Sequence, residues 1–584
     1  MIFSAFCLRE VASGFVGGPF GAGLEMSVLA LTAVAAVSVM SCSSSSGDSA
    51  EAAAIAFIED HLQRTKELEI GAARSWWKAN VTGSEEDFKA KEDAENALNQ
   101  ALSDTAAFAR LKEIRQRGEL QDPVLRRQIE VLYLAYLGKQ VDPELLRRMT
   151  AKANEVEKIF NTYRAEVGSR RLTENDVRTI LKESPDSAER EAAWKASKGV
   201  GRKVEAILKD LILLRNQAAQ ELGFRDYYAL SLHLNEQDEE ELLALFEELD
   251  ELTREPFRRE KAEADRVLAK RYSIDPGQLR PWHYEDPFFQ EAPRIYDVRL
   301  DKLYAGRDLA AISRDFYAGI GLPLDDVLER SSLYEQEGKS PHAFCIDIDR
   351  AGDVRILTNI RPNDYWMDTV LHELGHAAYS KYLDPGLPYL LRIESHILTT
   401  EAIAMMFGRL PKQPGWLRAA LGLEESEAAR AGGEARKMLR LASLIFSRWC
   451  QVMLHFEREL YRDPNQDLST LWWDLVERYQ GVRGPEERHE PDYASKIHLV
   501  AAPVYYHNYM MGELLASQIH HAIARELGAD DPASLVYAGD ARVGEFLKKK
   551  VFGPGRKIGW NELAEFATGE PLGAKNYAED FVNR

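Results

Sequence analysis

From about residue 51 onward, apolar residues recur at spacings of three and four along almost the whole chain. Between them lie mostly Ala, Leu, Glu, Lys and Arg, which are strong helix formers. The pattern predicts helices over 84–115, 123–137, 143–167, 203–222, 238–270, 434–461 and 508–527. Because each such helix must bury its apolar stripe against another, the sequence predicts a mainly α fold.

One region departs from this pattern. Residues 344–349, "FCIDID", alternate apolar and polar side chains, "RAGD" follows as a turn, and 354–360, "VRILTNI", are rich in β-branched residues. These features predict a β-hairpin just before the segment that contains His372. An extended edge in this place could hold a peptide by main-chain hydrogen bonds.

Composition limits the class of protein. The chain has 584 residues, of which 45% are hydrophobic, enough for a large core. Its formal net charge of −20 disfavours nucleic acid and anionic membrane surfaces as partners. Proline- and glycine-rich stretches at 275–287 and 552–560 are typical of loops, not of linkers between domains. We therefore expect residues 51–584 to form one large helical unit, with one lobe or two.

The N-terminal residues are typical of an export signal. Residues 26–41 are apolar and uncharged, and they precede Cys42 and the polar run "SSSSGDS". "VMSC" resembles a bacterial lipobox, so we predict a leader over 1–41, a lipid anchor at Cys42, a flexible tether over 42–50 and a periplasmic or membrane-anchored location. The alternatives are translation from Met26 and an unprocessed N-terminus. The other two cysteines in the sequence, Cys345 and Cys450, lie outside the leader, and whether they pair is left open.

The segment "DTVLHELGHAAYS", residues 368–380, contains an HExxH motif inside an apolar helical pattern. On a helix, His372 and His376 share one face and can both bind one metal ion. Glu401, which opens the apolar run "EAIAMMFGRL" and lies 25 residues after His376, is the candidate third ligand. The set of two histidines and one carboxylate predicts a catalytic site with one Zn²⁺ per chain.

Glu373 lies beside the first histidine. Zinc lowers the pKa of bound water to about 7 and polarises a carbonyl group. A carboxylate in this position can accept the proton of that water and pass it to the leaving amine. The motif therefore predicts a zinc metallopeptidase with Glu373 as its general base.

Several segments together resemble one family. "HELGH" with the downstream "EAIA", "PHAF" before it, "KIHLVAAPVYYHNYMMGELLASQ" after it and "SWWKANVTGSEEDFKAKEDAENALNQ" near the start are similar to the angiotensin-converting-enzyme family of zinc peptidyl-dipeptidases. "LRNQAAQELGFRDYYALSL" is equally similar to the thimet-type oligopeptidases. Either resemblance implies a large helical ellipsoid with a deep substrate channel between two lobes.

The resemblance to the first family implies further site residues. His342 in "PHAF" matches a histidine that binds substrate near the scissile bond, and His498 matches one that contacts the substrate backbone. Lys496 and Tyr506 match two groups that bind the C-terminal carboxylate of the substrate, while Tyr509 matches the tyrosine that stabilises the oxyanion. An ammonium and a phenol suit a carboxylate, and a phenol beside zinc suits a developing negative charge.

The register in this region has an alternative. The assignment of Tyr506 and Tyr509 allows one inserted residue after His498, whereas an ungapped alignment selects Tyr505 and Asn508.

The chain also departs from the family pattern. Met405 stands where the family has an acidic residue that orients a zinc histidine, so another carboxylate must do this or the metal is held less firmly. The chloride-binding arginine of animal members aligns with His507 or Asn508, which argues against chloride activation. The third carboxylate-binding residue, a glutamine in animal members, has no match around Tyr284.

The sequence leaves three functional hypotheses. The leading hypothesis is an exported zinc peptidase that removes C-terminal dipeptides from short peptides. The second is a thimet-type oligopeptidase that cleaves internally with the same chemistry. The third, from another class, is a catalytically silent, lipid-anchored peptide-binding protein, which zinc-dependent activity would contradict.

Overall fold

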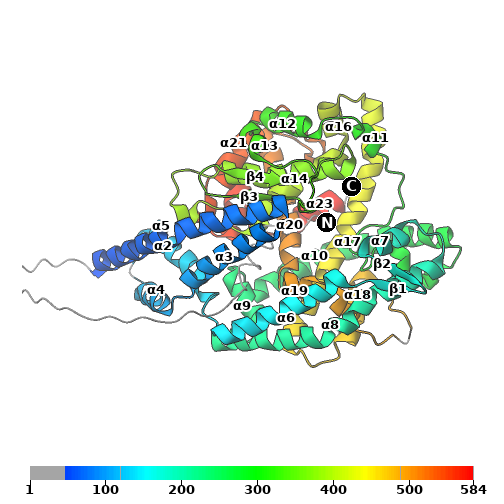
Figure 1. The fold of residues 1–584 in the computed structure, drawn as a ribbon. Helices are drawn as coiled ribbons and strands as arrows, with labels where there is room; N and C mark the ends of the chain where they lie inside the picture. Colours follow the sequence, from blue (N-terminus) through cyan, green and yellow to red (C-terminus); the bar gives the residue numbers. More distant parts are fainter. Residues whose placement is uncertain (1–45, 119, 487, 583–584) are drawn as a thin grey trace, which may run out of the picture.

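The computed structural model describes residues 46–582 except residues 119 and 487 (Figure 1). Its α-helices are α2 (Ser46–Thr82), α3 (Glu85–Leu102), α4 (Thr105–Arg117), α5 (Pro123–Leu137), α6 (Pro143–Thr162), α7 (Glu174–Glu183), α8 (Ser187–Glu221), α9 (Tyr227–Leu234), α10 (Glu239–Tyr272), α11 (Asp301–Tyr304), α12 (Leu309–Gly319), α13 (Asp325–Arg330), α14 (Asp364–Lys381), α15 (Ile397–Gly408), α16 (Pro414–Leu421), α17 (Glu425–Arg462), α18 (Leu468–Gln480), α19 (His498–Ala501), α20 (Tyr506–Leu527), α21 (Ala541–Leu547), α22 (Trp560–Thr568) and α23 (Lys575–Phe581). The predicted mainly α fold is confirmed.

Two small antiparallel sheets complete the fold. β3 (Phe344–Asp347) pairs with β4 (Val354–Leu357), which confirms the predicted hairpin before the metal-binding motif. β1 (Ala165–Val167) pairs with β2 (Arg170–Leu172) and was not predicted. The prediction that a helix continues to residue 167 is wrong, because α6 ends at Thr162.

Polar caps divide the helical pattern more finely than its apolar spacing does. Residues 84–115, predicted as one helix, form α3 and α4, because the Asp104 side chain accepts the N–H groups of Ala106 and Ala107 and starts a new helix there. Conversely, α10 continues through Pro256. The helical class is thus set by periodicity, while the breaks depend on single capping residues.

Helices α14, α15 and α20 pack closely at the centre of the fold, and two glycines permit this approach. A Cβ atom added to Gly375 of α14 would lie 2.8 Å from the Cα of Ala404 on α15. One added to Gly512 of α20 would lie 3.2 Å from the Cβ of Glu401, also on α15. Gly375, an unfavourable residue in a helix by propensity, is therefore explained by backbone contact with the neighbouring helix.

The hairpin β3–β4 lies between α14 and the long N-terminal helix α2 (Figure 1). The Trp76 ring of α2 packs edge-on against Phe344 of β3, with ring centroids 4.3 Å apart. On the far side of β4, Ser332 donates its N–H to Ile356 and accepts the N–H of Thr358. Because β4 is covered in this way, β3 provides the free edge of this sheet among the described residues.

The helices form two groups in Figure 1. Helices α6, α8 and α18 lie with β1–β2 in the lower part of the view, and α12, α13, α14 and α16 lie in the upper part. Helix α17 extends from one group to the other, and α20 lies between them. The deep channel remains a prediction.

Several expectations concern the ends and the cysteines. Cys345 in β3 and Cys450 in α17 are both buried and free, so they do not pair. Within the described part of the chain, no helix has the length and apolar character needed to cross a bilayer. The predicted leader and Cys42 lie outside the described residues and stay predictions.

Candidate metal centre and active site

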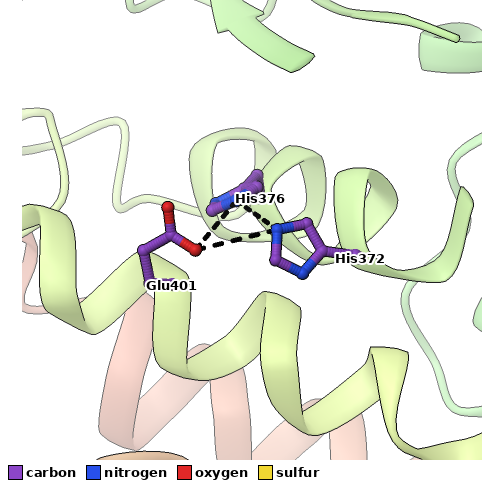
Figure 2. A group of neighbouring side chains, drawn as sticks. All are labelled: His372, His376 and Glu401. Atoms are coloured by element: carbon purple, nitrogen blue, oxygen red, sulfur yellow. Dashed lines mark hydrogen bonds and ion pairs between the residues drawn. The ribbon is translucent and has the colours of Figure 1, made fainter. Parts of the chain in front are cut away.

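Three side chains from two adjacent helices converge on one point (Figure 2). His372 and His376 lie one turn apart on α14, with their Nε2 atoms 3.3 Å apart. Glu401 Oε2 of α15 lies 3.7 Å from His372 Nε2 and 3.9 Å from His376 Nε2. Within the described residues, this is the one group of three or more such side chains close enough to share a metal ion.

The donor set fits zinc. Two tetrahedral ligands at ~2.0–2.1 Å from zinc lie about 3.3 Å apart, which matches the separation of the two imidazole nitrogens. Burial lowers the pKa of His372 to about 4 and also lowers that of His376, so both rings are in the neutral form that binds metals. Burial, and secondarily the negative charge of Glu513, raise the pKa of Glu401 to about 8. A divalent ion would supply the compensating positive charge.

Glu373 is fully buried, and neither of its carboxylate oxygens has a hydrogen-bond partner within the described protein. Burial, and secondarily the neighbouring Glu401, raise its pKa well above the ordinary value. A buried carboxylate without protein partners beside a candidate metal site is suited to accept a proton from a water molecule held there.

A hydroxyl group, not a carboxylate, contacts the second histidine. Nδ1 of His376 lies 2.7 Å from Oγ1 of Thr400, which is buried on α15 next to Glu401. Since Nε2 of His376 faces the other two ligands, we assign the proton to Nδ1, which then donates to Thr400. At the position where the family has an acidic residue, Met405 packs with its sulfur near Gly512. The orienting group expected for a zinc histidine is thus supplied to His376 by a different residue type.

The predicted carboxylate-binding residues Lys496 and Tyr506 lie together in a buried cluster with Gln290. Lys496 Nζ donates to Oε1 of Gln290 over 2.7 Å, and the Tyr506 hydroxyl donates to the same oxygen over 3.1 Å. The ammonium nitrogen also lies 5.0 Å from the centroid of the Phe288 ring and 5.1 Å from that of the Trp449 ring. Burial lowers the pKa of Lys496 to about 7, against the opposing effect of Asp286.

Gln290 is a residue that the sequence analysis missed. Tyr284, around which the sequence offers no matching glutamine, lies elsewhere: its hydroxyl accepts from Lys261 and donates to Asp265. Gln290 follows six residues later in "YEDPFFQ". Its residue type was the one signal that could have found it, and nothing in the neighbouring sequence distinguishes it from other glutamines.

The other predicted residues differ in their placement. His498 and Tyr509 are buried beside Tyr506, with ring centroids 5.0 and 5.5 Å from it. His342 is exposed at the start of the hairpin, and its N–H donates to Ser340. In the alternative register, Asn508 points elsewhere and accepts from Gln237 over 2.6 Å. The geometry therefore favours the register that contains Tyr506 and Tyr509.

Comparison with known proteins decides the family. The pattern of the peptidase M2 family, described as angiotensin-converting enzyme, matches residues 48–257 and 291–577, which is most of the chain. The chain belongs to this family. At that level, the prediction of a zinc metallopeptidase is confirmed, and His372, His376 and Glu401 form a site that suits the metal on which the angiotensin-converting-enzyme family depends.

Individual relatives are distant. Angiotensin-converting enzyme of Mesocricetus auratus is 24% identical over 566 residues, which is 90% of this chain and 42% of the hamster protein. That of Rattus norvegicus is 25% identical over 391 residues, 61% of this chain and 29% of the rat protein. That of Theromyzon tessulatum is 21% identical over 496 residues, 78% of this chain and 79% of the leech protein. The chain thus spans less than half the length of the hamster and rat proteins.

Gln290 also lies just outside the family match. The match leaves out residues 258–290, and Gln290 is the last of these. In this segment the chain differs from the family pattern, although the folded structure places the glutamine beside Lys496 and Tyr506.

Proposed function

We propose that the protein is a peptidyl-dipeptidase, which removes dipeptides from the free C-terminus of short peptides. The observation that carries the proposal is the buried cluster of Lys496, Tyr506 and Gln290, called the carboxylate pocket below. Two donors, an ammonium and a phenol, converge on one amide oxygen. The same donors can bind the oxygens of a substrate carboxylate by charge-assisted hydrogen bonds.

The position of this pocket along α20 supports the release of two residues. Gly512 contacts Glu401, and Tyr506 lies six residues earlier on the same helix. At 1.5 Å per residue, the separation along the helix axis is about 9 Å. Two extended residues span up to about 7 Å. A peptide whose carboxylate is held by Tyr506 would therefore place its second-last peptide bond near the metal site.

The chain's own residues then have the following roles in the proposed reaction. When bound, zinc would supply the Lewis acid that polarises the peptide carbonyl and acidifies water. Glu373 accepts the proton of the attacking water and returns it to the leaving amine. Tyr509 and His498 donate hydrogen bonds to charge that develops on the substrate. The free edge of β3, which follows His342, pairs with the extended peptide.

Cleavage position tests the proposal. The purified chain, loaded with zinc, is incubated with a decapeptide that has a free C-terminus and with its C-terminal amide, and the products are identified by mass spectrometry. Successive loss of dipeptides from the free acid, and slow cleavage of the amide, is the expected result. Internal fragments from both peptides at similar rates would favour the oligopeptidase. Absence of zinc-dependent products would favour the peptide-binding protein.

Gln290→Leu provides a variant from the same pocket. It should raise KM for the free acid and leave cleavage of the amide little changed, because only the free acid uses the carboxylate pocket.

We also propose export with a lipid anchor at Cys42, supported by the lipobox-like sequence. Labelling of the protein with a radioactive fatty acid tests this proposal, and Cys42→Ser should abolish the labelling.

A further inference from the structure

The backbone is strained immediately before α20. Val504 has φ of +54° and is 3% exposed. This left-handed conformation is rare for residues other than glycine, and it is least favourable for β-branched side chains such as valine. Such a residue persists only where the surrounding structure holds it in place.

Glu457 of α17 holds this residue. Its Oε1 accepts the N–H of Val504 over 2.8 Å, and the Glu457 side chain is 2% exposed. Because the N–H is buried, loss of the acceptor would leave it without a partner and remove the contact that opposes the strain. Glu457 touches neither the zinc ligands nor the carboxylate pocket in any hydrogen bond that the structure gives it.

The preceding helix, α19, is held by Arg215. Arg215 of α8 donates to the carbonyl oxygens of Leu499 and Val500 over 2.9 and 2.8 Å, and to the hydroxyl of Tyr461 over 3.1 Å. It thereby satisfies carbonyl groups of the short helix α19, whose first residue is His498. Arg215 therefore holds the helix before the link formed by residues 502–505, and Glu457 holds Val504 near the end of this link.

This link sets the direction of α20. Tyr505 is the residue before the helix, Tyr506 is its first residue and Tyr509 lies one turn later. We propose that Glu457 is a positioning residue, which fixes the Val504 turn and through it the places of Tyr506 and Tyr509. The consequence for catalysis rests on the proposed function, whereas the turn itself does not.

The test uses three variants of the full, zinc-loaded chain. Glu457→Leu removes the acceptor, Glu457→Gln keeps an acceptor of the same shape, and Glu457→Leu with Val504→Gly removes the strain that the acceptor opposes. For each, the ratio of kcat/KM for the free-acid peptide to that for its amide is measured. A merely destabilised enzyme has fewer active molecules, which lowers both values equally and leaves the ratio unchanged.

We expect Glu457→Leu to lower the ratio about tenfold, because the strained Val504 turn is then no longer held and Tyr506 loses its place. Glu457→Gln should retain it, and the added Val504→Gly should restore it toward that of the unmodified chain. An unchanged ratio in Glu457→Leu, or a reduced ratio that Val504→Gly leaves reduced, would overturn the positioning role.

Hydrogen exchange gives a second readout that does not depend on the proposed function. Glu457→Leu should speed exchange of the amides of residues 504–509 about tenfold relative to α8, while Glu457→Gln should not. If the unmodified enzyme itself cleaves the acid and the amide equally well, the carboxylate-binding role of Lys496 and Tyr506 is refuted. The exchange rates then test by themselves whether Glu457 fixes the Val504 turn. Unchanged exchange at residues 504–509 would refute the turn.

Discussion

The Nδ1 atom of His376 lies 2.7 Å from the hydroxyl oxygen of Thr400. Thr400 precedes Glu401 on α15, so one short segment supplies both a metal ligand and the group that orients another ligand. This arrangement links the geometry of α14 to that of α15. It also makes the metal site dependent on a neutral partner, which supports the basicity of the imidazole less than a carboxylate does.

Thr400→Val should lower zinc affinity about 10- to 100-fold, because the imidazole loses its hydrogen-bond acceptor. Competition with a chromogenic chelator measures the affinity. Thr400→Ser should retain most of it. Thr369→Val is the matched control, since the hydroxyl of Thr369 on α14 donates to the carbonyl of Tyr365 and not to a metal ligand. Equal affinity in Thr400→Val and Thr369→Val would contradict the orienting role.

Glu373→Gln should lower kcat by about 10²- to 10⁴-fold, because the amide cannot accept the proton of the attacking water. Zinc content, measured by atomic absorption, should stay at one ion per chain. Glu401→Gln is the contrasting variant and should lose zinc along with activity. Near-normal turnover in Glu373→Gln would show that another group is the base.

Tyr509→Phe should lower kcat by about 10²- to 10³-fold, with little change in KM, because the hydroxyl acts on charge that develops in the transition state. Tyr505→Phe tests the alternative register on a neighbouring tyrosine, and it should leave kcat within a few-fold. Steady-state kinetics on one peptide measures both variants. The reverse order of effects would assign the role to Tyr505.

The pH dependence of substrate choice should follow Lys496. Burial lowers the pKa of this lysine to about 7, so its ammonium form predominates below pH 7 and its neutral form above. Preference for a free-acid peptide over its amide should therefore be greatest at acidic pH and fall about tenfold per pH unit above 7, until neutral contacts alone remain. Using the ratio of the two kcat/KM values cancels ionisations at the metal site. In Lys496→Met the ratio should be low and independent of pH; a pH-dependent ratio in that variant would contradict the assignment.

Much of the fold could be predicted because helical periodicity is local. The helix over 123–137 was predicted to the residue, and the hairpin before the metal site was predicted from its alternation and turn. The β1–β2 hairpin could not be predicted, because its two strands have three residues each and follow a helical pattern without a change in period. Likewise, the break between α3 and α4 depends on one capping aspartate.

The sequence by itself determined the pair of metal-binding histidines and the glutamate between them, because four residues of helix bring two side chains onto one face whatever surrounds them. It also determined the helical class, since burial of apolar stripes follows from their spacing. Only the tertiary structure decided which partners complete the site. Gln290 meets Lys496 across 206 residues, Thr400 meets His376 from another helix, and Glu457 holds Val504 from a third. The physical reason is that these contacts join segments distant in the chain, and no local pattern records which polar side chain will face which after the helices have packed.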